Sequence, residues 1–162
     1  MLSLATLAVA ACCLLLAVAA PAPAAAANPV LTFFEGTLDA PFSLEQPLDP
    51  ALTVGDGLDQ QLRLVTPLES DLPVTAAASS QALDFRRPTL EKEFLSLSWD
   101  AIKPHGTNLF ISYSVDGAAW LPAVGGGGFD MPRGTHGRTI AYTVSMMSGD
   151  ATVSPAVDYI VI

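Results

Sequence analysis

The chain has 162 residues, with 16 acidic and 7 basic side chains, so its formal net charge at pH 7 is −9. A surface of this sign repels the phosphates of nucleic acids, and we therefore exclude nucleic acid as a partner. The two cysteines stand together near the start of the chain, at Cys12 and Cys13, so the remaining residues have neither a disulfide framework nor cysteine chemistry.

The first 27 residues carry no charge and consist mainly of apolar and small side chains. An apolar run from Leu2 to Ala20, followed by small residues up to Ala27, is typical of a secretory signal peptide that is cleaved after Ala27. We therefore expect a secreted, extracellular protein with no membrane contact once residues 1–27 are removed, and one domain at residues 28–162. A lipoprotein box at 9–12 and a retained membrane anchor are the alternatives.

Short strand patterns separated by glycine and proline come next, and no segment after residue 27 has a sustained helical period. Residues 30–34 are predicted to form a first strand, and residues 51–54 and 61–65 a hairpin. Residues 67–80 are predicted to form a loop, because the alanines and serines at its end offer little to pack. The N-terminal half should therefore contribute only short strands.

Alternation of apolar and polar residues is strongest in the second half, where several segments have the two-residue period of a strand. The residues predicted to face the core are Leu95, Leu97 and Trp99, then Leu109, Ile111, Tyr113 and Val115, then Ile140, Tyr142, Val144 and Met146. A last strand is expected at residues 158–162. Many short strands with glycine and proline turns predict an all-β fold, an antiparallel, jelly-roll-like β-sandwich of about eight strands without disulfides.

Asp116-Gly117 is a tight-turn signal just before Trp120, and it leaves two registers open. A two-residue type I′ turn would pair Trp120 with Tyr113 and bury the indole in the core. A type I turn with a left-handed bulge would instead pair Trp120 with Ser112 and place it beside Phe110, as a platform for stacking on a sugar. We favour the first register, since a large aromatic side chain gains most from burial.

The string Ser114-Val-Asp-Gly-Ala-Ala-Trp120 resembles the hairpin of discoidin-like, galactose-binding-type β-sandwiches and of accessory modules in secreted bacterial cell-wall enzymes. Residues 99–107 resemble the loop before that hairpin in modules beside muramoyl-alanine amidases, and Ser154-Pro155 resembles their closing segment. The resemblance covers about residues 82–162. Its motifs are turn and core positions, so it implies a β-sandwich module and no catalytic residue.

Histidines and arginines in two loops are candidate ligand-binding side chains, together with exposed aromatic ones. One loop holds His105, and the other, residues 131–138, brings together donors that suit a carboxylate or a hydroxyl-rich ligand. The candidate ligand-binding set is Trp120, Phe110, Arg133, His136, Arg138 and His105. Plain solvent exposure is the alternative for the loop residues. No nucleophile motif accompanies the histidines, so we predict that the protein is not an enzyme.

Asp56 and Asp59, in an acidic loop with glycines, are candidate Ca²⁺ ligands together with backbone carbonyls. Their spacing matches no calcium-loop motif, so the sequence requires no cofactor and structural Ca²⁺ stays an alternative. The expected function is a non-catalytic secreted module that binds carbohydrate or cell-wall glycan through loops at one end of the sandwich. The alternative is a structural or protein-interaction domain of the cell envelope without a small-molecule ligand.

Overall fold

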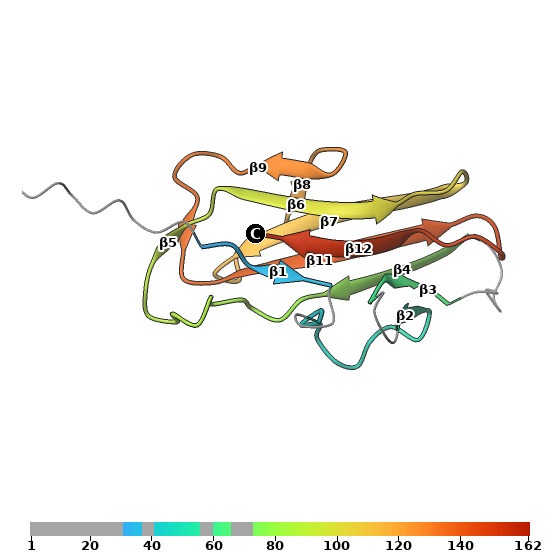
Figure 1. The fold of residues 1–162 in the computed structure, drawn as a ribbon, viewed down its shortest axis with the longest axis horizontal. Helices are drawn as coiled ribbons and strands as arrows, with labels where there is room; N and C mark the ends of the chain where they lie inside the picture. The colour runs from blue at the N-terminus through green and yellow to red at the C-terminus, as the bar shows by residue number, and fades with distance from the viewer. Residues whose placement is uncertain (1–30, 37–40, 56–59, 66–72) are drawn as a thin grey trace, which may run out of the picture. The chain divides into compact units, whose positions relative to one another are not determined.

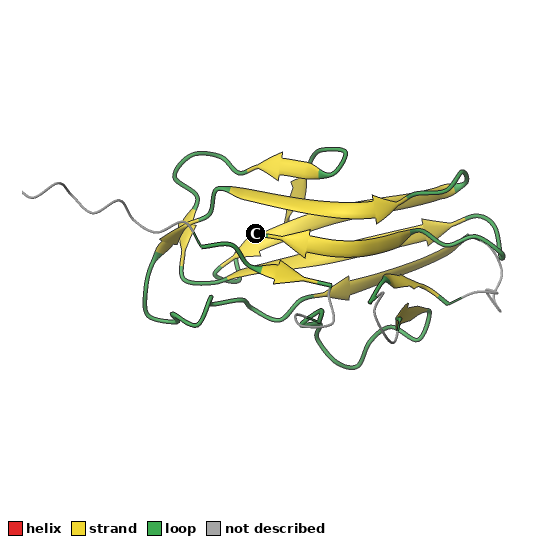
Figure 2. Cartoon of the chain, viewed as in Figure 1, coloured by secondary structure: helices red, strands yellow, loops and turns green. Residues whose placement is uncertain are grey.

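The computed structural model of the protein describes residues 31–36, 41–55, 60–65 and 73–162. Their regular structure consists of strands, and no helix occurs among them (Figures 1 and 2). It follows that the described part of the chain has no helix able to cross a membrane. The predicted signal peptide at residues 1–27, with both cysteines, lies outside the described residues.

Twelve strands form in the described residues, most of them short. They are β1 (Phe34–Glu35), β2 (Leu52–Val54), β3 (Leu62–Leu64), β4 (Val74–Ser79), β5 (Lys92–Glu93), β6 (Ser96–Ile102), β7 (Thr107–Val115), β8 (Leu121–Ala123), β9 (Gly128–Asp130), β10 (His136–Gly137), β11 (Ile140–Ser148) and β12 (Ala156–Val161). The three longest strands, β6, β7 and β11, are those whose alternation is strongest in the sequence.

The strands form two main antiparallel sheets and one small pair. The first sheet has the order β2-β3-β12-β6-β9, and β1 also pairs with β12. The second has the order β4-β11-β7-β8, while β10 pairs only with β5. Figure 1 shows β6 and β12 in one layer and β7 and β11 in the layer behind it. The two sheets pack against each other, so the predicted antiparallel β-sandwich is confirmed.

Apolar side chains from both sheets form one core between the layers. Its most deeply buried members include Leu97, Val157 and Ile160 from the first sheet and Ile111, Tyr113, Tyr142, Val144 and Met146 from the second. In β11, burial alternates along the strand as the two-residue period requires. β7 pairs with β11 over its whole length, so the core-facing residues of the two strands lie side by side.

Val74–Ser79 form strand β4, so the prediction of a loop at residues 67–80 is wrong for this part of the segment. Val74, Ala76 and Ala78 are buried, and their strand pairs with β11 along six residues. Alanine stands on both faces of this strand, so the sequence has little contrast between inward and outward positions. Backbone pairing with β11, together with the burial of small side chains, is what makes the segment a strand.

Leu95 is exposed, so the prediction that it faces the core together with Leu97 and Trp99 is wrong. β6 begins one residue later, and Phe94 is buried instead, at 4% exposure. The amide of Phe94 donates to the carbonyl of Thr135, and the carbonyl of Leu95 accepts from the amide of Met131. These bonds to a neighbouring loop turn the chain before β6 starts, and the alternation begins only after that turn.

Candidate functional site

The Asp116-Gly117 turn between β7 and β8 has the predicted two-residue geometry. Asp116 and Gly117 have φ values of 51° and 72°, and the amide of Ala118 donates to the carbonyl of Val115 at 2.9 Å. These are the features of a type I′ turn. If its register continued along the hairpin, Trp120 would lie opposite Tyr113.

Trp120 does not lie opposite Tyr113, because one extra residue is inserted between the turn and β8. Leu121 pairs with Tyr113, and Ala123 pairs with Ile111. An inserted residue of this kind is a β-bulge, and it reverses the faces of the side chains that follow. The indole of Trp120 is accordingly 48% exposed, whereas Tyr113 is 3% exposed. The favoured prediction that Trp120 is buried is therefore wrong, although the predicted turn type is right.

The carboxylate of Asp116 fastens the loop that precedes β11 to the end of β7. Its Oδ1 atom accepts from the amides of Arg138 and Thr139, each at 2.8 Å, and from the Thr139 hydroxyl at 3.2 Å. Hydrogen bonding, with the Thr139 amide contributing most, lowers the pKa of Asp116 below its ordinary value. The Ser114 hydroxyl donates to the carbonyl of Ala118 at 2.7 Å. The polar side chains of the Ser-x-Asp-Gly string therefore hold the turn and its loop.

Gly137 permits the close approach of this loop. A Cβ atom at that position would lie 2.2 Å from Cγ1 of Val115 and 3.0 Å from Oδ2 of Asp116. The neighbouring side chains of Arg133, His136 and Arg138 are all exposed. The candidate loop residues therefore lie at the same end of β7 as the turn that leads to Trp120.

His105 lies at the opposite end of β7, in the connection from β6. β7 has nine residues, so roughly 27 Å separates its two ends. Phe110 lies between them and is 64% exposed. The structure thus brings Trp120 and the 131–138 loop to one end of the sandwich and leaves His105 at the other.

Four exposed apolar side chains lie on β7, on β8 or directly beside β8 in the chain. These are Phe110, Trp120, Leu121 and Val124, which are 48–74% exposed and which we call the edge strip. Scattered exposed apolar residues are ordinary, but a group on neighbouring strands is a feature of binding surfaces. β8 is the last strand of its sheet, so the edge strip lies at a free sheet edge.

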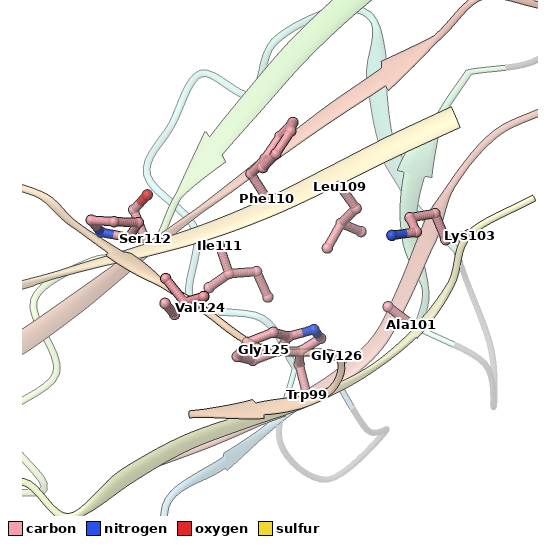
Figure 3. Close-up of a pocket in the computed structure, with 12 residues that line it drawn as sticks. Trp99, Ala101, Lys103, Leu109, Phe110, Ile111, Ser112, Val124, Gly125 and Gly126 are labelled. Atoms are coloured by element: carbon pink, nitrogen blue, oxygen red, sulfur yellow. The ribbon is translucent and has the colours of Figure 1, made fainter. Parts of the chain in front are cut away.

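A groove with a volume of about 550 Å³ opens between the two sheets at the edge strip, and two residues of the strip, Phe110 and Val124, also line it. Its apolar walls come from Trp99 and Ala101 of β6 and from Leu109 and Ile111 of β7, as Figure 3 shows. Among the described residues that line the groove, Lys103 is the one with a charge. Ligand pockets in proteins have volumes of about 300–1,000 Å³ and apolar walls with a few polar groups, so the groove has the dimensions of a ligand site.

A buried pair that the sequence analysis missed links the two sheets. The hydroxyl of Tyr142 in β11 donates to Oε2 of Glu35 in β1, and the amide of Ser43 donates to Oε1 of Glu35 at 3.2 Å. Tyr142 is 0% exposed and Glu35 is 1% exposed. Burial, reinforced by the negative charge of Glu35, raises the pKa of Tyr142 far above its ordinary value.

The candidate calcium ligands Asp56 and Asp59 lie outside the described residues. In the part of the chain that the structure describes, no group of three or more His, Cys, Asp or Glu side chains could hold a metal ion.

No protein-family model, no curated protein and no solved structure matches this chain. Of the resemblance drawn from the Ser-x-Asp-Gly-x-x-Trp string, the coarse part holds: the described part of the chain is all β, with two antiparallel sheets.

Proposed function

We propose that the protein is a non-catalytic secreted module that binds carbohydrate or cell-wall glycan, with Trp120 as its stacking platform. The exposed indole is the observation that supports this most. A tryptophan side chain offers 150–250 Å² of surface and gains more than most side chains from burial. Here a bulge between the turn and β8 leaves it 48% exposed.

The surroundings of Trp120 suit a sugar. An aromatic face packs against the apolar C–H face of a pyranose ring, and nearby donors bind its hydroxyl groups. The exposed side chains of Arg133, His136 and Arg138 are donors at the same end of the sandwich. The resemblance to galactose-binding-type sandwiches, which covers about residues 82–162, points to the same class of ligand.

Binding to a glycan array, compared between the wild type and the Trp120→Ala variant, tests this function. We expect the substitution to weaken binding about tenfold or more, which corresponds to about 1.4 kcal/mol. Leu95→Ala is the matched control, because Leu95 is 56% exposed and precedes a strand of the first sheet. Absence of glycan binding by the wild type, or equal binding by the Trp120→Ala variant, would refute the proposal.

A structural or protein-interaction domain of the cell envelope is the second candidate function, and the edge strip favours it. Val124 is the most exposed member, at 74%. For this function we expect a blank glycan array and capture of an envelope protein that the Val124→Ser variant no longer captures. Retained capture by that variant would count against the edge strip as the contact surface.

A further inference from the structure

The groove beside the edge strip exists because β8 is shorter than the strand it pairs with. β8 ends at Ala123, and the chain then crosses from the second sheet to β9 of the first. Residues 107–110 of β7 therefore have no partner on that side among the described strands. Gly125 makes the crossing tight, since a Cβ atom there would lie 2.1 Å from the carbonyl oxygen of Gly128. The result is an open edge between β6 and β7.

The walls of this opening are apolar. Trp99 and Ile111 are 8% and 3% exposed and form the deep part, while Ala101, Leu109 and Ala123 are half-buried nearer the surface. A Cβ atom at Gly126 would meet nothing within 4 Å, so the lip of the groove is open. An unbranched hydrocarbon would find apolar contact along both sheets here, and the transfer of each CH₂ group from water into the groove favours binding.

Two hydrogen-bond donors lie on one side of the groove. In Figure 3 the ammonium end of Lys103 points over the cavity toward Leu109, and the indole nitrogen of Trp99 lies on the Ala101 side of its ring. Within the described residues, the one buried side-chain nitrogen or oxygen that lacks a partner is Oε1 of Gln60. The Trp99 indole nitrogen is not among such buried, unpartnered atoms.

We infer that this groove binds an unbranched monocarboxylic acid, with its hydrocarbon chain between β6 and β7 and its carboxylate at Lys103. A carboxylate accepts charge-assisted bonds from an ammonium group, which are stronger than bonds between neutral groups. The molecule as a whole carries a charge of −9 and repels anions, so an anion needs a local cation such as Lys103 to bind. This site excludes Trp120 and goes beyond the proposed glycan binding.

The tryptophans provide a direct readout. The chain has two, so the Trp120→Phe variant retains Trp99 as its one tryptophan, in the wall of the groove. Decanoate, added to that variant below its micellar concentration, should change the Trp99 emission in a saturable way with one molecule bound per chain. An emission that does not respond to decanoate would overturn the inference.

The carboxylate is tested with Lys103→Met in the same Trp120→Phe background, using decanoate and 1-decanol as paired probes. We expect the variant to bind decanoate about tenfold more weakly, the loss of one hydrogen bond to a charged group, and to bind 1-decanol as before. Arg87→Met is the matched control, because it removes the same charge from an exposed loop residue that does not line the groove. Equal binding of decanoate by the Lys103→Met and Arg87→Met variants would refute the role of Lys103.

The groove itself is tested by Ala101→Phe, which fills it and should abolish the binding of both probes. Near-ultraviolet circular dichroism checks that this variant is folded, and Lys103, being exposed, can be replaced without loss of core packing. Glycan binding by the Lys103→Met variant should equal that of the wild type. A glycan array without binding would thus refute the proposed glycan function and not the fatty-acid site. Absence of decanoate binding would refute the fatty-acid site and not the glycan function.

Discussion

At the scale of single residues, the hydrogen bond between Tyr142 and Glu35 joins two buried polar side chains from different sheets. Both side chains are buried, and the carboxyl group has two partners, the Tyr142 hydroxyl and the amide of Ser43. Removing one partner of a buried charged group leaves that group poorly solvated, which costs more than the bond itself contributes. Replacing both members by apolar side chains removes the charge as well and avoids that cost.

We expect Tyr142→Phe to lower the free energy of unfolding by about 3 kcal/mol, because it removes a partner of a buried carboxylate. The double variant Glu35→Met/Tyr142→Phe should lose less than this single variant. Urea unfolding followed by circular dichroism measures both. Tyr113→Phe is the control, since Tyr113 lies directly opposite Tyr142 in β7 and should cost little. A double variant less stable than Tyr142→Phe would show that Glu35 contributes in another way.

At the scale of elements, the carboxylate of Asp116, in the turn between β7 and β8, holds the loop that precedes β11. Asp116→Asn keeps a residue type that tolerates positive φ, and it removes the charge that the amides of Arg138 and Thr139 face. We expect faster hydrogen exchange at these two amides in the variant than in the wild type, measured by NMR near pH 6. Asp130→Asn in β9 is the control.

The pH dependence of the same effect has a definite sign. The pKa of Asp116 is lowered in the folded protein, so its stabilisation is present above the ordinary value of about 3.9 and is lost as the pH falls through the lowered one. The difference in exchange between the wild type and Asp116→Asn should therefore shrink at acidic pH. A difference that persists unchanged there would mean that the charge of Asp116 does not hold the loop.

The elements also show how far the sequence predicts the structure. β11 and β7 are long, and large apolar residues recur at every second position in both, so their existence and most of their inward positions follow from the pattern. The strand β4 cannot be predicted in this way, because alanine lies on both of its faces and the sequence shows no two-residue period there. The exposure of Trp120 depends on one inserted residue after a correctly predicted turn. The residues between Ala118 and Trp120 are not of a type that indicates a bulge.

Contacts between residues far apart in the chain are a second kind of feature that the apolar and polar pattern of the sequence does not predict. Glu35 reads as a polar residue after a short apolar segment, and Tyr142 as one more core residue. Their bond joins positions 107 residues apart in the chain, so it follows from packing of the sheets and not from local spacing. The groove has the same origin, since it depends on where β8 ends relative to β7.

At the scale of the whole molecule, the bond between Glu35 and Tyr142 connects the two sheets, because β1 pairs with β12 in the first and β11 lies in the second. This makes the stability of the sandwich depend on the protonation of one phenol. The pKa of Tyr142 is raised in the folded protein, and that of an unfolded tyrosine is about 10. Above that pH the unfolded chain releases a proton that the folded chain retains, so unfolding becomes more favourable as the pH rises.

We therefore expect the free energy of unfolding to decrease above about pH 10, with Tyr142 contributing up to about 1.4 kcal/mol per pH unit. Growing negative charge also destabilises the molecule in this range, since the net charge is already −9 at pH 7. That repulsion acts equally on the Tyr142→Phe variant, so the difference between the two proteins isolates the phenol. Urea unfolding of both at pH 9, 10 and 11 should show the stability advantage of the wild type narrowing with pH. An advantage that stays constant up to pH 11 would mean that Tyr142 ionises as readily in the folded core as in the unfolded chain.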